Sequence, residues 1–79
     1  MEKLYCMFVK KFTSGQKTFY VAAVCSSYGF IQDVFISQAL FELISSEIDE
    51  YGFFDVTNYF HLQYDKKLDK LVYTLNKQE

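Results

Sequence analysis

Arginine and proline are both missing from this chain. Because there is no arginine, all eight of its Lys and Arg positions are lysine. Arginine is the preferred bidentate reader of phosphates and guanine edges, and its absence argues against sequence-specific recognition of nucleic acid. Lysine here accompanies many Phe, Tyr and Ile residues, a composition typical of an AT-rich gene, as in a low-GC bacterium or its phage.

Long apolar runs are also missing. The longest, residues 18–25, is much shorter than the ~20 residues that a membrane span needs, and the first residues resemble no signal peptide. We therefore expect a cytoplasmic protein that does not contact a membrane. In that compartment Cys6 and Cys25 are expected to be free, buried thiols, with a disulfide between them as the alternative.

The residues that are present favour a folded chain. Of the 79 residues, 51% are hydrophobic and 23% are charged, which is not the composition of a disordered protein. A chain of this length holds one domain, spanning residues 1–79. Its nine Phe and seven Tyr are more than one small core can cover, so some rings are expected at the surface.

Two β-rich segments, residues 4–12 and 17–26, flank turn-forming residues and predict a hairpin with a four-residue loop. That loop places Leu4 opposite Cys25 and Phe8 opposite Val21, on one apolar face. The other face is also apolar, which is unusual for a surface in contact with water. It holds Tyr5, Met7, Val9, Tyr20, Ala22 and Val24.

The middle of the chain predicts a strand and then a helix. Residues 30–36 are predicted as a third strand, although a helix that begins at Asp33 fits the pattern almost as well. Ser37 is a suitable N-cap, apolar residues follow at helical spacing up to Tyr51, and Gly52 stands at the favoured C′ position.

Residues 56–63 and 71–76 predict a second hairpin, in the register Phe60–Leu75, Leu62–Tyr73 and Tyr64–Leu71. The whole pattern predicts an α+β fold, with a small antiparallel sheet of four to five strands in the chain order β-β-(β)-α-β-β and one amphipathic helix on one face. The helix is expected to dock through Phe41, Ile44 and Ile48 onto the strand face that contains Phe8, Val21, Phe60 and Leu62.

No residues with the spacing of a catalytic site are evident. In the predicted registers both cysteines face the core and His61 faces away, so a cysteine–histidine pair is not expected. One histidine and two cysteines lack the spacing of metal ligands. Glu47, Asp49 and Glu50 lack the glycine and alternating ligands of a calcium loop. We therefore predict no enzyme activity, no metal and no cofactor.

Charge is distributed unevenly along the chain. Between Lys17 and Lys66 there is no Lys or Arg. The three acidic residues Glu47, Asp49 and Glu50 fall in the last turns of the helix, where the helix dipole disfavours negative charge. This arrangement predicts an acidic patch that binds a basic surface of another protein, such as a nucleic-acid-binding one. The alternative is a solvated helix face that only confers solubility.

The lysines gather at the two hairpin turns: Lys10, Lys11 and Lys17 at the first, and Lys66, Lys67 and Lys70 at the second. Lysine at such positions protects strands from edge pairing. If both turns lie on one side of the domain, they form a phosphate-binding edge beside the stacking candidates Tyr5, Tyr20 and Tyr59. The net charge of −2 weakens that interpretation.

The sequence thus predicts a non-enzymatic protein-binding module, a small regulator or inhibitor of mobile-element or phage type. It would act by occlusion, through the acidic helix end and an aromatic sheet face, and it is expected to form a homodimer. The candidate partner-binding residues are Glu42, Glu47, Asp49, Glu50, Asp55, Tyr5, Met7, Val9, Tyr20 and Tyr59. Two alternatives remain: a nucleic-acid-binding domain that uses the hairpin lysines, and a structural component of a larger assembly.

Overall fold

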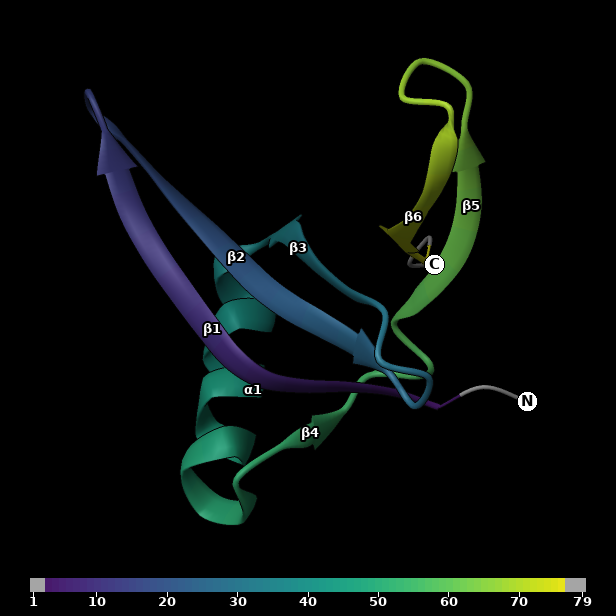
Figure 1. The fold of residues 1–79 in the computed structure, drawn as a ribbon. Helices are drawn as coiled ribbons and strands as arrows, with labels where there is room; N and C mark the ends of the chain where they lie inside the picture. Colours follow the sequence, from purple (N-terminus) through teal and green to yellow (C-terminus); the bar gives the residue numbers. More distant parts are fainter. Residues whose placement is uncertain (1–2, 77–79) are drawn as a thin grey trace.

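A computed structural model describes residues 3–76, which form a four-stranded antiparallel sheet, a helix against one face of it, and a separate two-stranded hairpin (Figure 1). The strands are β1 (Leu4–Ser14), β2 (Lys17–Ser26), β3 (Ile31–Ile36), β4 (Phe54–Asp55), β5 (Phe60–Asp65) and β6 (Lys70–Leu75), and the helix is α1 (Gln38–Tyr51). The larger sheet has the order β3-β2-β1-β4, and β5 pairs with β6. The predicted α+β fold class is confirmed.

The β1–β2 hairpin has a different register from the predicted one. Its loop has two residues instead of four, and Gly15 in that loop has a positive φ of 66°, which glycine adopts at little cost. A β-bulge between Cys6 and Phe8 then shifts the register, so that Phe8 lies opposite Ala23 and not opposite Val21. The predicted register is therefore wrong.

The bulge decides which side chains of β1 face the helix. An extra residue in one strand reverses the alternation of side chains beyond it. Cys6 is buried in the core, but after the bulge it is Val9 that packs against the core, whereas Phe8 is 58% exposed.

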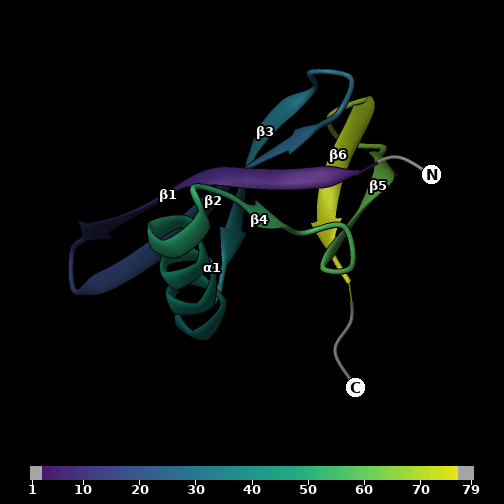
Figure 2. The same cartoon turned by 90° about the horizontal axis from the view of Figure 1, so that it is seen from below.

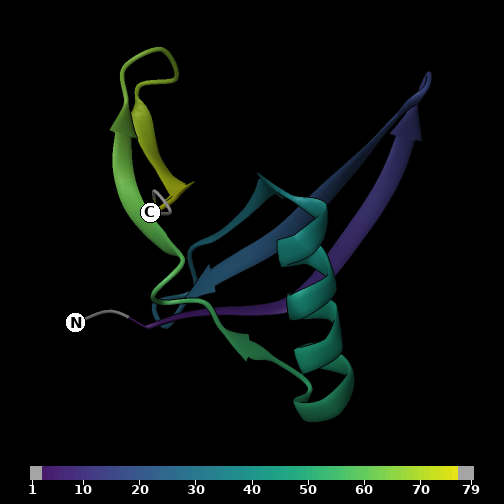
Figure 3. The same ribbon diagram turned by 180° about the vertical axis from the view of Figure 1, so that it is seen from behind.

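Helix α1 begins and ends as predicted. The Ser37 hydroxyl accepts a hydrogen bond from the Leu40 N–H (3.2 Å), and Gly52, with a φ of 85°, donates its N–H to the Ile48 carbonyl (2.7 Å). A helix that begins at Asp33 is excluded, because Asp33 lies in β3, which pairs with β2 along its length. Figure 3 shows the helix crossing β1 and β2 on one side of the sheet.

The sheet face beneath the helix differs from the predicted face. Of the four residues predicted there, only Phe60 belongs to the core: Phe8 and Leu62 are exposed, and Val21 points to the opposite face. The helix covers the face that was predicted to be open, where the Tyr20 ring packs on the Phe41 ring with centroids 4.9 Å apart. The buried core consists of Leu4, Cys6, Ala22, Val24, Ile36, Leu40, Ile44, Val56, Phe60 and Tyr73.

The β5–β6 hairpin has the predicted register throughout. Its first strand begins at Phe60, however, and the predicted start at residue 56 is wrong. Asp55 accepts a hydrogen bond from the Thr57 N–H (2.9 Å) and so stabilises a turn over residues 57–59. Just before this turn lies β4, a strand that the sequence did not predict. It pairs with the beginning of β1.

Tyr73 fixes the hairpin to the larger sheet. Its backbone N–H donates to the Gln32 side-chain oxygen (2.6 Å), and its hydroxyl donates to the Phe30 carbonyl (3.2 Å). The hairpin lies near the N-terminal end of β1, and the helix crosses the middle of this strand (Figure 2).

Candidate functional site

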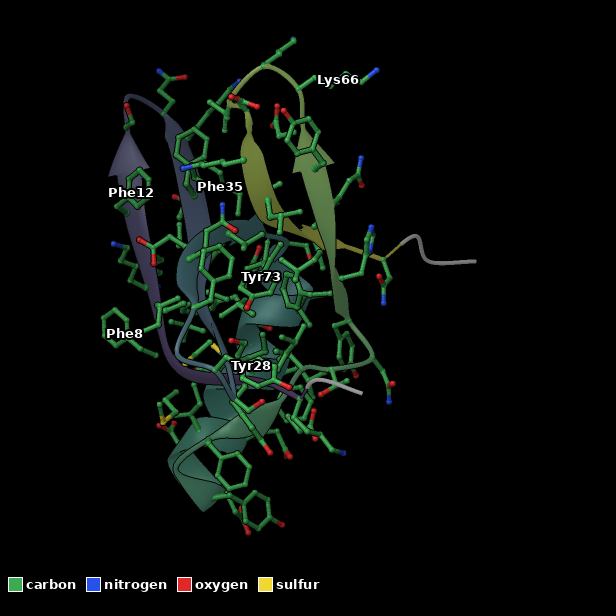
Figure 4. All side chains as sticks on the ribbon, turned by 45° about the vertical axis from the view of Figure 1, so that its right-hand side comes forward. Phe8, Phe12, Tyr28, Phe35, Lys66 and Tyr73 are labelled. Carbon is green, nitrogen blue, oxygen red and sulfur yellow. The ribbon has the colours of Figure 1, made fainter. Side chains whose placement is uncertain are left out.

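The sheet face opposite α1 carries exposed apolar side chains. Phe8 is 58% exposed, Phe12 43%, Ile31 64% and Phe35 65%. Together with the half-buried Phe19 they form what we call the open aromatic face. Figure 4 shows Phe8 and Phe12 projecting from β1, and Tyr73, by contrast, lying within the fold. A surface of this kind is uncommon on a protein that acts alone in water.

Three of these rings contact one another across the strands. Phe12 stacks on Phe19 with centroids 5.4 Å apart, and Phe35 lies 6.0 Å from Phe19 and 6.5 Å from Phe12. Val21 lies at the middle of the same face and is buried. The rings are therefore held in a packed cluster, which lowers the entropy that a binding partner would have to remove.

An ion pair crosses the centre of the open aromatic face. Lys10 lies opposite Val21 and Asp33 lies opposite Ala23, so their side chains meet above β2, with Nζ 3.4 Å from the carboxylate. Both groups are about half exposed, so the pair contributes little to stability. Around it lies a hollow of about 240 Å³, lined by Lys10, Phe12, Val21, Asp33 and Phe35.

The predicted acidic residues lie on two elements, α1 and β4. Glu42, Asp49 and Glu50 line a shallow groove of about 450 Å³ along α1, together with Phe41, Ser45 and Ser46. Glu47 is half-buried and does not line the groove. Asp55 lies apart, on β4.

Asp55 makes local contacts within the fold. The Thr57 hydroxyl and N–H both donate to its carboxylate, and the Lys3 ammonium lies 3.9 Å away. These hydrogen bonds, and to a smaller extent Lys3, lower the pKa of Asp55. The same Thr57 hydroxyl accepts from the Leu4 N–H (2.9 Å), so the turn also holds the beginning of β1.

The predicted aromatic and apolar site residues are distributed over several surfaces. Val9 and Tyr20 pack against the core beneath α1, and their assignment to an open face is wrong because α1 covers their side of the sheet. Tyr5 packs edge-on against Phe53, and Tyr59 packs against Phe54. Met7 is exposed at the bulge itself. The exposed rings of the open aromatic face were missed, because the predicted register placed Phe8 in the core.

The lysine-bearing turns lie at one end of the molecule. The tips of β1–β2 and β5–β6 point in the same direction, and the C-terminal end of α1 points the opposite way (Figure 1). Lys66 stands at the second tip, at the same end as Phe12 on β1 (Figure 4). Asp65 in that second turn has a structural role, because its carboxylate accepts from the Lys67 and Leu68 N–H groups (2.8 and 3.1 Å).

The cysteine and histidine side chains make local contacts. Both cysteines are free, and burial raises the pKa of the Cys6 thiol, which donates to the Phe8 carbonyl (3.3 Å). His61 is exposed on the second hairpin and hydrogen bonds with Asn76 and Gln63. Within residues 3–76, no group of three or more His, Cys, Asp or Glu residues could hold a metal ion.

In the described part of the chain, α1 is too short to cross a bilayer. No protein-family model, curated protein or solved structure matches this sequence.

Proposed function

We propose that this chain is a non-enzymatic protein-binding module and that its binding surface is the open aromatic face. The observation that carries the proposal is the exposure of Phe8, Phe12, Ile31 and Phe35 on one sheet face. The exposed parts of these side chains amount to roughly 400 Å² per molecule, taking about 200 Å² for each ring. At ~25 cal/mol per Å², covering this surface would contribute roughly 10 kcal/mol before the costs of association.

Occlusion is the mode of action that fits such a surface. A small domain that presents a packed, largely preformed apolar face blocks a partner by covering it, without any chemical step. The acidic groove along α1 supplies a second contact for a basic partner, since Glu42, Asp49 and Glu50 are exposed there without any basic residue on the helix. We place this activity, as a regulator or inhibitor of mobile-element type, in the cytoplasm.

Retention of host proteins on the immobilised chain tests the proposal. Extract is treated with nuclease and passed over the natural chain, over Phe35→Glu, and over the control Tyr28→Glu, which changes an 85% exposed residue in the β2–β3 turn. We expect one set of proteins to be retained by the natural chain and the control and lost by Phe35→Glu. Equal retention by all three variants would contradict the proposal.

A second candidate function is binding of single-stranded nucleic acid. It is favoured by one specific observation, that the lysine-bearing tips of both hairpins point to the end of the molecule where Phe12 lies (Figure 4). Stacking on rings and contact with phosphates are the two components of such binding. Fluorescence anisotropy with a labelled oligonucleotide at low salt tests it. Sub-micromolar affinity that falls steeply with salt, and falls again in a Lys66→Gln, Lys67→Gln double variant, would favour this function over protein binding.

A further inference from the structure

The open aromatic face has features of an interface between identical molecules. We propose that it is a twofold interface between two copies of this chain. This inference rests on the proposed protein-binding function and names the partner.

Full contact of the two faces buries an area at the lower limit for a specific dimer. The apolar part of each face is roughly 400 Å², so two faces in contact bury about 800 Å², and Lys10, Asp33 and the half-buried Phe19 bring the total to the order of 1,000 Å². A specific interface should exceed roughly 1,000 Å² in total. A domain of 79 residues buries a small share of its own surface, and association is a common way to add to it.

The charges on the face complement a second copy. Lys10 and Asp33 stand on either side of β2, one on β1 and the other on β3. We place a twofold axis between the two faces, at right angles to the line from Lys10 to Asp33. This axis brings Lys10 of each copy over Asp33 of the other. Two ion pairs then become a ring of alternating charges, with no like charges directly opposed. An isologous interface requires this self-complementarity.

The shape of the open aromatic face is also complementary to a second copy of itself. The exposed rings of Phe8 and Phe35 project from β1 and β3, the two neighbours of β2, and the smaller Val21 and Ala23 lie between them on β2, with the hollow of about 240 Å³ above. Because the proposed axis runs obliquely across the strands, the rings of one copy lie over the central strand of the other. They fill the hollow instead of meeting head-on.

The rest of the molecule is compatible with this pairing. Helix α1 covers the other face of the sheet (Figure 3), so the dimer has the layer order helix, sheet, sheet, helix. The acidic grooves of the two copies then point away from each other, which keeps their charges apart and leaves them accessible.

Sedimentation of the full chain over a range of concentrations tests the inference. We expect the natural chain to form a dimer as concentration rises, and we expect Phe8→Glu and Phe35→Glu to remain monomeric with unchanged helix content by circular dichroism. Leu68→Glu is the matched control, since Leu68 is 59% exposed in the second hairpin turn and should leave the dimer intact.

The ion pair gives a second, independent measurement. Lys10→Asp places four acidic groups together at the axis and should weaken the dimer, whereas the exchange Lys10→Asp with Asp33→Lys restores the alternation and should recover most of the affinity. Failure of the exchanged variant to dimerise better than Lys10→Asp alone would overturn the proposed axis.

The natural chain remaining monomeric at high concentration would overturn the inference, as would a dimer unaffected by both phenylalanine substitutions. The proposed function has a separate outcome. If the chain is monomeric and Phe35→Glu still loses retained host proteins, the face binds a different protein and only the homodimer falls. If the chain is monomeric, Phe35→Glu loses no retained protein and an oligonucleotide binds instead, then both the homodimer and the protein-binding function are refuted.

Discussion

Replacing Ile44 by alanine tests how the helix is placed on the sheet. Ile44 is fully buried (0% exposed) at the centre of α1, and it belongs to the core cluster with Cys6 and Val24. Truncating a side chain so enclosed removes its burial energy and leaves a cavity, at a cost of about 2–5 kcal/mol. For a domain of this size, each kcal/mol lowers the melting temperature by roughly 4–8 °C, so a decrease of more than ~10 °C is expected.

Leu43→Ala is the matched control. Leu43 is adjacent in the same helix and loses similar atoms, but it is 42% exposed and lies outside the core cluster. Its replacement should cost well under half as much, since the side chain is already partly in water. Both variants are compared by thermal and urea unfolding followed by circular dichroism. Equal losses of stability in the two variants would refute the placement of the helix.

Three further outcomes are expected. With a thiol reagent, the half-buried Cys25 should react in the native protein. The buried Cys6, whose pKa is raised by burial, should react only after unfolding, and rapid reaction of both would contradict the packing of β1. The pKa of Asp55 is lowered in the fold, so its stabilising effect is present above the usual carboxyl pKa of about 4 and is lost as pH falls through the lowered value. Asp55→Asn should therefore have a lower melting temperature than the natural chain at neutral pH and the same melting temperature in acid. A difference that persists in acid would argue against this. Replacing Asp49 and Glu50 by their amides should leave the free energy of unfolding unchanged or raise it by roughly 0.3–1 kcal/mol per charge, because both oppose the helix dipole. A clear loss of stability would show a structural role.

Local sequence signals predicted much of the fold. Ser37 and Gly52 mark the ends of α1 because each satisfies backbone groups that the helix leaves unpaired, and this depends on a few neighbouring residues. The register of β5–β6 was likewise predictable, since alternation along Phe60–Asp65 and Lys70–Leu75 specifies a single pairing.

The candidate site was not predictable in the same way. The β-bulge at Met7 carries no glycine or other local signal, yet it decides whether Phe8 or Val9 faces the helix. The side chains on both faces of the β1–β2 hairpin are largely apolar, so hydrophobicity alone does not distinguish the covered face from the open one. The short strand β4 was missed for a related reason: two residues show no periodicity, and their pairing with β1 depends on tertiary structure.

The open aromatic face is the surface through which we propose that this protein binds. Isoleucine methyl groups report on it directly, because Ile31 lies on that face with 64% exposure and Ile44 is fully buried under the helix. Methyl spectra are recorded with a soluble paramagnetic agent, first at low and then at high protein concentration, and again with any protein that the chain retains. We expect the agent to broaden the Ile31 signal at low protein concentration and association to protect it, while Ile44 stays protected throughout. An Ile31 signal that remains equally broadened in every one of these samples would contradict the claim.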